Sequence, residues 1–189
     1  MLYLASKSPR RRELLGRLGV EFNPIDLDIP EVRQPGETPA DYVVRVAREK
    51  AMAGLQRLEA RGGALVLGSD TEVVLDDEVF GKPADAADAV AMLQLLSGRT
   101  HQVISAVSLV GASGEWRDCS FTSVTFGELT DAVIERYVAT GEAFGKAGAY
   151  GIQGAAEVFV SRLEGSYSGV MGLPLYETDK LLRQAGVIA

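Results

Sequence analysis

The side chains with the clearest chemical potential lie near the start of the chain, where two serines precede a proline and three arginines. Ser6 and Ser8 stand before Pro9, and arginines fill positions 10–12. Ser8 is a natural N-cap and proline is favoured in a first helical turn, so a helix is predicted to begin at Pro9. Cations at a helix N-terminus are each disfavoured by roughly 0.3–1 kcal/mol. Free amides, hydroxyls and guanidinium groups together suit a phosphate, so we interpret the segment as a phosphate site; a surface helix with scattered arginines is the alternative.

Two carboxylates follow the most compact apolar run of the sequence. Residues 64–68 predict a buried strand that delivers Asp70 and Glu72 at its carboxyl end, where open α/β sheets commonly bind ligands. If the strand continues, both side chains project to one face, and they repel unless a cation lies between them or one is solvated. Metal ligation and a solvated edge-strand face are both open, and for Glu72 we favour the solvated face.

Two lysines could supply positive charge to the same ligand. Lys50 falls on the apolar stripe of a helix predicted to start at Thr38, so its amine either snorkels to water or points into a cleft. Lys82 precedes Pro83, which biases the lysine towards an extended backbone. Phosphoryl chemistry requires cations, a metal and a carboxylate that can orient or deprotonate water. Together these residues favour such chemistry more than any of them does alone.

Composition excludes several other classes of protein. The 189 residues carry a net charge of −7, which argues against binding nucleic acid through the overall field. With one histidine and one cysteine, a zinc site, a histidine triad and an internal disulfide are all disfavoured. We expect a cytoplasmic protein without a membrane segment or signal peptide, and any metal should be a hard ion on carboxylate oxygens, with Mg²⁺ the first candidate. His101 and Cys119 both fall in predicted strands, and we interpret them as structural.

Helical and strand patterns alternate along the chain, which predicts an α/β fold with a mixed sheet and flanking helices. We expect one domain over 1–189, with two closely packed lobes as a possible arrangement. The predicted helices begin near residues 9, 38, 85, 130 and 174, and the predicted strands cover the start of the chain, an extended stretch within 20–30, then 64–68, a hairpin over 73–80, an antiparallel pair over 100–110 and 115–126, and 158–163.

Six segments resemble, in order, the motif series of the Maf family, and the resemblance covers essentially the whole chain. They are residues 6–11, 28–31, 48–51, 68–71, 81–83 and 147–154. The resemblance implies a nucleoside triphosphate pyrophosphatase that cuts between the α- and β-phosphates. It also implies a fold similar to that of the inosine triphosphate pyrophosphatases, with a mixed α/β architecture around a central cleft, and usually a homodimer.

The resemblance also assigns roles to individual side chains. Four would hold phosphate groups: Ser6, Ser8, Arg10 and Arg11. Lys50 and Lys82 would neutralise the triphosphate. Asp70 would bind a divalent metal, Mg²⁺ or Mn²⁺, and activate or orient the attacking water, with Glu31 as a second acidic partner and metal ligand. All these positions carry the required residue types.

The run at 148–154, which contains Gln153, is similar to the branch of the family that acts on dTTP and UTP. Gln153 would contribute to nucleotide recognition, and modified uridine triphosphates would be further substrates in a house-cleaning role. The branch for 7-methyl-GTP usually departs from this pattern. One departure is Glu72, which stands where many members carry an apolar residue. The alternatives are a purine-preferring pyrophosphatase and a nucleotide-binding regulator of cell division and septum formation; retention of Asp70, Glu31 and both lysines favours an enzyme.

Overall fold

The computed structural model describes residues 1–59 and 62–189, and within them seven strands form one mixed sheet in the order β2-β1-β3-β5-β6-β7, with β4 paired to β3. The strands are β1 (Leu2–Ala5), β2 (Phe22–Ile25), β3 (Leu65–Leu75), β4 (Glu78–Phe80), β5 (Thr100–Gly111), β6 (Gly114–Phe126) and β7 (Val160–Glu164). The helices are α1 (Pro9–Gly16), α2 (Pro39–Arg57), α3 (Ala86–Leu96), α4 (Asp131–Ala139), α5 (Tyr167–Met171) and α6 (Leu175–Gln184), with short 3₁₀ turns η1 (Ala147–Ala149) and η2 (Ala155–Phe159). The predicted fold class, a mixed sheet with flanking helices, is confirmed.

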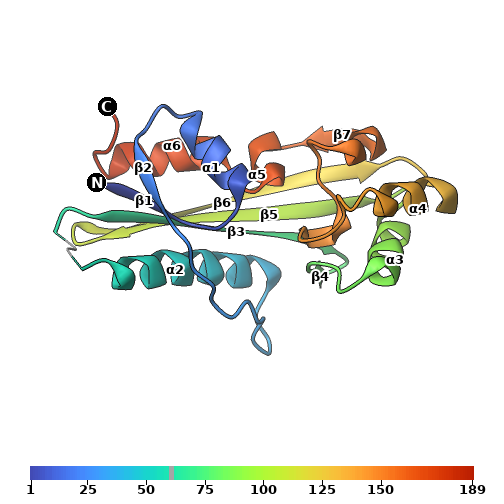
Figure 1. Cartoon of the computed structure of the whole chain (residues 1–189), viewed down its shortest axis with the longest axis horizontal. Helices are drawn as coiled ribbons and strands as arrows, with labels where there is room; N and C mark the ends of the chain where they lie inside the picture. The colour runs from blue at the N-terminus through green and yellow to red at the C-terminus, as the bar shows by residue number, and fades with distance from the viewer. Residues whose placement is uncertain (60–61) are drawn as a thin grey trace.

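Three long strands, β3, β5 and β6, form the antiparallel centre of the sheet and run along the length of the molecule (Figure 1). The short strand β1 pairs in parallel with both β2 and β3. Because β1 leads directly into α1 and lies beside β3, the amino-terminal helix starts close to the middle of β3. The serines and arginines at the start of the chain therefore lie near the carboxylates of the long strand.

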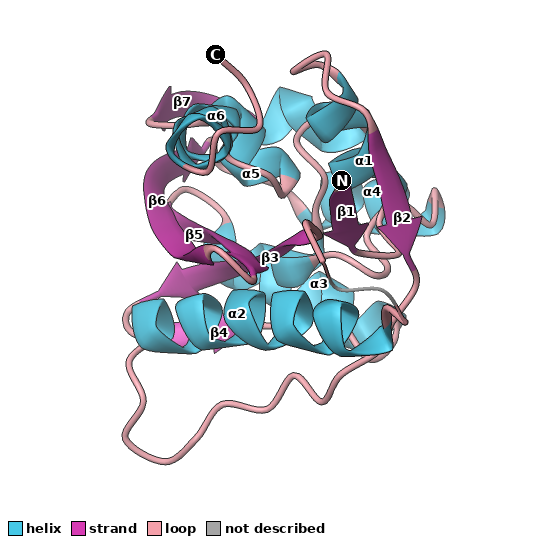
Figure 2. Ribbon diagram, turned by 90° about the vertical axis from the view of Figure 1, so that its left-hand side faces the viewer, coloured by secondary structure: helices cyan, strands magenta, loops and turns pink. Residues whose placement is uncertain are grey.

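Helix α2 covers one face of the sheet, while α1, α5 and α6 lie on the other (Figure 2). The apolar stripe of α2 that its periodicity predicted is buried; it includes Val43, Val46 and Ala47. The helix approaches β3 very closely at Gly68, since a Cβ atom there would collide with the Ala47 carbonyl oxygen. Glycine is required at this position, and the short distance between the elements places the side chain at position 50 directly over β3.

Helices α1 and α2 begin as predicted, with an N-cap followed by proline. Ser8 Oγ accepts a hydrogen bond from the Arg11 amide at 3.4 Å, and Thr38 Oγ1 accepts one from the Asp41 amide at 3.1 Å. These bonds satisfy amides that a helix start otherwise leaves free. Leu14 and Leu15 of α1 are fully buried and hold the helix against the core.

The carboxyl-terminal third departs from prediction in two places. The last strand starts at Val160 instead of residue 158, because the 3₁₀ turn η2 occupies the preceding residues. Helix α5 follows Ser166, which caps it by accepting a hydrogen bond from the Gly169 amide at 3.0 Å, and it was not predicted. Among the helices described, none combines the length and the apolar character needed to cross a membrane.

Candidate active site

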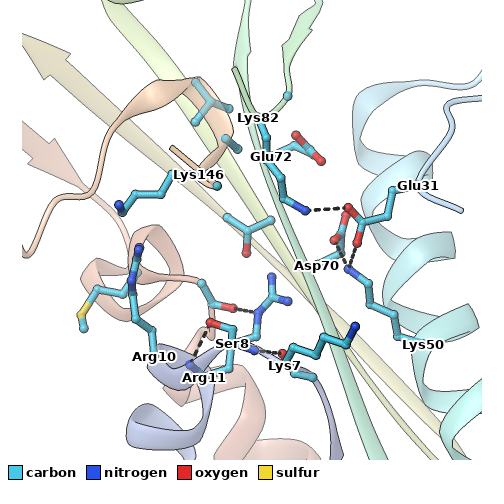
Figure 3. A pocket seen from close by; sticks show the side chains of 18 of the residues that line it. Lys7, Ser8, Arg10, Arg11, Glu31, Lys50, Asp70, Glu72, Lys82 and Lys146 are labelled. Atoms are coloured by element: carbon cyan, nitrogen blue, oxygen red, sulfur yellow. Dashed lines mark hydrogen bonds and ion pairs between the residues drawn. The ribbon is translucent and has the colours of Figure 1, made fainter. Parts of the chain in front are cut away.

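A cleft of about 620 Å³ opens between the start of α1, the face of β3 and the segment around η1 (Figure 3). Its lining contains eight of the nine side chains to which the family resemblance assigns a role: Ser6, Ser8, Arg10, Arg11, Glu31, Lys50, Asp70 and Lys82. They form two groups. We call Ser6, Ser8, Arg10 and Arg11 the serine–arginine side, and Glu31, Lys50, Asp70 and Lys82 the lysine–carboxylate side.

The serine–arginine side is shaped by the turn between β1 and α1. Ser6 Oγ accepts a hydrogen bond from the Ser8 amide at 3.1 Å, so the turn is held by its own side chains. Arg11 Nε donates to the Gly172 carbonyl oxygen at 2.8 Å, which ties α1 to the end of α5. Arg10 lines the cleft and forms no ion pair with any described carboxylate. Arg11 is therefore positioned by a backbone contact, and neither arginine is neutralised by a described carboxylate, so both charges are available to an anion.

Burial has the largest influence on the pKa of the Arg11 guanidinium and lowers it. The negative charges of Asp70, Glu31 and Glu72 oppose that shift. The opposing contributions show that the arginine lies within electrostatic range of the lysine–carboxylate side. A ligand that spans the cleft would meet both groups at once.

On the lysine–carboxylate side every ammonium has a carboxylate partner. Lys50 Nζ lies 2.7 Å from Asp70 Oδ1 and 2.6 Å from Glu31 Oε1, and Lys82 Nζ lies 3.1 Å from Glu31 Oε2. Lys50 is only 8% exposed, because the close packing of α2 on β3 points its stem inwards. The cleft-facing interpretation of Lys50 is therefore confirmed. Burial alone would raise the pKa of Glu31, but the two ammonium groups outweigh it, so this pKa lies below its usual range.

Asp70 and Glu72 share one face of β3, as the alternation predicted, but the interpretation of Glu72 as a solvated edge residue is wrong. Glu72 is 8% exposed and lines the cleft, and Asp70 is 4% exposed. Strand β3 pairs with β5 through this region and α2 covers it, so the face is turned away from bulk solvent. Burial, followed by the charges of Asp70 and Glu31, raises the pKa of Glu72 to about 8.

In the described residues that line the cleft, two buried carboxylate oxygens have no hydrogen-bond partner. They are Asp70 Oδ2 and Glu72 Oε2, both in side chains that line the cleft. In the described parts of the chain no group of three His, Cys, Asp or Glu side chains could hold a metal ion. Mg²⁺, however, is usually bound through one or two carboxylates together with water and substrate phosphates. The unpartnered oxygens thus fit a hard divalent cation shared with a bound phosphate.

Gln153, the ninth residue with an assigned role, lies elsewhere. It is exposed in the turn before η2 and does not belong to the cleft lining. Its role in nucleotide recognition stays a prediction.

Lys146 lines the cleft opposite the lysine–carboxylate side and was not assigned a role from the sequence. Its ammonium donates to the Glu142 carbonyl oxygen, and burial together with the nearby Arg10 charge lowers its pKa. The signal that could have found it is a lone lysine within a run of small residues, where backbone segments approach closely. Lys146 adds a further cation at the Arg10 end of the cleft.

His101 is buried beside Tyr150, a residue of the cleft lining, as expected of a structural histidine. Its Nε2 lies 2.8 Å from the hydroxyl of Tyr150, whose ring lines the cleft, and burial lowers the pKa of the imidazole to about 4. Cys119 is partly buried in β6, and burial raises the pKa of its thiol to about 11, which keeps the thiol protonated and unreactive.

Comparison with known proteins shows what the chain is similar to. A "dTTP/UTP pyrophosphatase" from Xanthomonas campestris is 59% identical over 188 residues, which cover 98% of this chain and 99% of that protein. A "Nucleoside triphosphate pyrophosphatase" from Xylella fastidiosa is 61% identical over 183 residues, or 96% of this chain and 97% of that protein. Among solved structures, the Ham1 protein of Staphylococcus aureus aligns with a TM-score of 0.44 at 15% identity, over 66% of this chain and 71% of that one. Residues 1–185 match the Maf-like protein family, and the chain therefore belongs to it.

Proposed function

We propose that this protein hydrolyses dTTP and UTP to the nucleoside monophosphate and pyrophosphate. The observation that carries the proposal is a buried aspartate, Asp70, with one oxygen paired to Lys50 and the other unpartnered, in the same cleft as an arginine-rich helix start. Relatives that are about 60% identical over nearly their whole length bear the name dTTP/UTP pyrophosphatase, which supports this choice of substrates.

The serine–arginine side would bind part of the triphosphate through the guanidinium groups of Arg10 and Arg11 and the hydroxyls of Ser6 and Ser8. Charge-assisted hydrogen bonds to phosphate are roughly twice as strong as neutral ones, and a helix N-terminus adds a favourable dipole. Lys50 and Lys82 would exchange Glu31 for phosphate oxygens. The triphosphate would then bridge the two sides of the cleft.

Hydrolysis requires water to attack the α-phosphorus in line with the leaving pyrophosphate. Asp70 would orient this water and take its proton while the bond between the α-phosphorus and the bridging oxygen breaks. The lysines and arginines would stabilise the negative charge that develops on pyrophosphate. A divalent metal, Mg²⁺ or Mn²⁺, held through Asp70 would add positive charge at the phosphates, and Glu31 is the second acidic residue that the family resemblance supplies.

Several further properties follow from the same proposal. Gln153 would contribute to base recognition, and modified uridine triphosphates would be accepted in a house-cleaning role. We also expect a single domain over 1–189, a homodimer, a cytoplasmic location and no nucleic-acid or membrane partner. Sedimentation of the purified protein at several concentrations tests the dimer.

Pyrophosphate release from dTTP, UTP, CTP, GTP, 7-methyl-GTP and ITP, each with and without Mg²⁺, tests the function directly. We expect metal-dependent release that favours dTTP and UTP. Preference for GTP, ITP or 7-methyl-GTP would keep the chemistry and replace the substrate assignment. Tight nucleotide binding without release would instead favour a nucleotide-binding regulator of septum formation.

A further inference from the structure

The acidic residues of the cleft differ in how many of their oxygens are already engaged. Glu31 uses Oε1 to contact Lys50 and Oε2 to contact Lys82, at 2.6 and 3.1 Å. Asp70 uses only Oδ1, and its Oδ2 has no partner. Glu72 likewise has a buried oxygen, Oε2, without a partner. The free coordinating capacity of the cleft therefore lies on Asp70 and Glu72, and not on Glu31.

Burial makes this difference important. A buried polar oxygen without a hydrogen bond is unfavourable, more so when it is charged, and such an atom therefore requires an explanation. Asp70 and Glu72 are 4% and 8% exposed, and both line the cleft. Side chains two residues apart on a strand project to the same face, so these carboxylates face the same space. The charge of Asp70 acts directly on the Glu72 carboxyl group.

We infer that Glu72, together with Asp70, supplies the protein carboxylates of a divalent-cation site, and that Glu31 serves as the counter-ion of the two lysines. The inference rests on the proposed function, since phosphate oxygens and water would complete the coordination. It accounts for both unpartnered oxygens with one ligand. It also agrees with the absence, among the described residues, of a three-residue metal cluster, because a cation shared with substrate needs fewer protein ligands.

The positive charges around the pair are compatible with this arrangement. Lys50 contacts Asp70 through the oxygen that the cation would not use, and Lys82 is held by Glu31. Arg11 is fixed to the Gly172 carbonyl oxygen and not to either carboxylate. A cation between Asp70 and Glu72 would thus displace no ion pair of the free protein.

A titration with Mn²⁺ alone tests the inference without nucleotide or turnover. Binding is measured as the loss of the electron paramagnetic resonance signal of the free ion. Glu72→Gln should weaken Mn²⁺ binding at least roughly tenfold, the lower end of what loss of ligand support costs a metal site. Glu31→Gln is the matched control, because it removes one negative charge from the same cleft. We expect it to weaken Mn²⁺ binding no more than about threefold, since Glu31 is partly exposed and solvent screens its charge.

A third variant, Glu72→Asp, separates direct ligation from a long-range field. It keeps the charge and withdraws the oxygens by one methylene group, so we expect intermediate affinity. Melting temperatures of all three variants show whether they are folded, and Glu72→Val provides a second, apolar replacement if Glu72→Gln proves unstable; it too should weaken Mn²⁺ binding at least tenfold.

Three results would overturn the inference: no Mn²⁺ binding by the native chain, equal affinity in Glu72→Gln and the native chain, or a larger loss in Glu31→Gln than in Glu72→Gln. Native affinity in Glu72→Asp would also overturn direct ligation. Failure of the proposed function is a separate result, because it would appear as absent pyrophosphate release from every nucleotide while Mn²⁺ binding is measured independently.

Discussion

The two sides of the cleft hold their charges in opposite ways. On the lysine–carboxylate side each ammonium is neutralised by a carboxylate at 2.6–3.1 Å. On the serine–arginine side, neither Arg10 nor Arg11 forms an ion pair with a described carboxylate; Arg11 is held by a backbone carbonyl oxygen. The lysines of one side are thus paired with carboxylates within the protein, whereas the arginines of the other side have charges available to bind an anion.

This difference indicates a division of labour. A triphosphate can bind to the serine–arginine side without breaking any ion pair, and the helix start adds its own positive partial charge. On the other side it must compete with Glu31 for Lys50 and Lys82. We therefore expect variants of the serine–arginine side to change nucleotide affinity, and variants of the lysine–carboxylate side to change turnover or stability.

Asp70→Asn should have the largest effect on turnover of the variants considered. A small effect would contradict the division between a catalytic and a binding side of the cleft. The variant keeps the size of the side chain but cannot accept the proton of the attacking water. Loss of a general base typically lowers kcat by roughly 10²–10⁴-fold, whereas affinity for a non-hydrolysable dUTP analogue, measured without metal, should change little. Pyrophosphate release and calorimetry measure the two quantities. A near-native kcat would show that Asp70 is not the base.

Lys50→Met and Lys82→Met compare a buried and an exposed lysine of the same network. Lys50 is 8% exposed, and its loss leaves the buried Asp70 without a partner, so unfolding free energy should fall by roughly 3 kcal/mol. The Lys82 side chain is 59% exposed, and its loss should cost less than about 1 kcal/mol. Urea denaturation at neutral pH checks both values. Equal losses would contradict the view that α2 packs Lys50 into the interior.

Much of the cleft was predictable because its parts are local in sequence. Ser8 and Pro9 define a helix start by cap chemistry alone, and the period of the following helix placed Lys50 on the buried stripe. The alternation along the strand put Asp70 and Glu72 on one face. The motif series of the family then assigned roles to these side chains that could not be inferred from any one of them alone.

What sequence could not provide is the environment that long-range packing creates. The burial of Glu72 depends on which helix covers β3, and that in turn depends on the absence of a side chain at Gly68. Lys146 lies in a run of small residues, and its neighbour in the cleft, Arg10, comes from the first helix of the chain. Helix α5 has only five residues, one of them a glycine, so its periodicity was too short to detect.

Arg10→Ala tests whether the serine–arginine side of the cleft determines nucleotide affinity. Loss of a charge-assisted hydrogen bond costs roughly 1.5–3 kcal/mol, so KM for dTTP should rise about 10–100-fold with a smaller change in kcat. Arg17→Ala is the matched control, because Arg17 lies just after α1, pairs with Glu13 at 2.7 Å and does not belong to the cleft lining. Steady-state kinetics on dTTP measures both variants. An unchanged KM with a large fall in kcat would move Arg10 from binding to catalysis.

Glu31→Gln should have the smallest effect and an opposite sign. Its two ion pairs hold Lys50 and Lys82 in the free protein, so neutralising Glu31 removes a competitor of the triphosphate. The Glu31 side chain is 31% exposed, and ion pairs that solvent screens contribute up to about 1 kcal/mol, so metal-free binding of a non-hydrolysable dUTP analogue should tighten by no more than about fivefold. Glu164→Gln, in an exposed pair with Arg162, is the control and should leave affinity unchanged. Calorimetry without metal decides the sign. Weaker binding in Glu31→Gln would mean that Glu31 positions the lysines for phosphate, and both sides of the cleft would then be arranged to bind an anion.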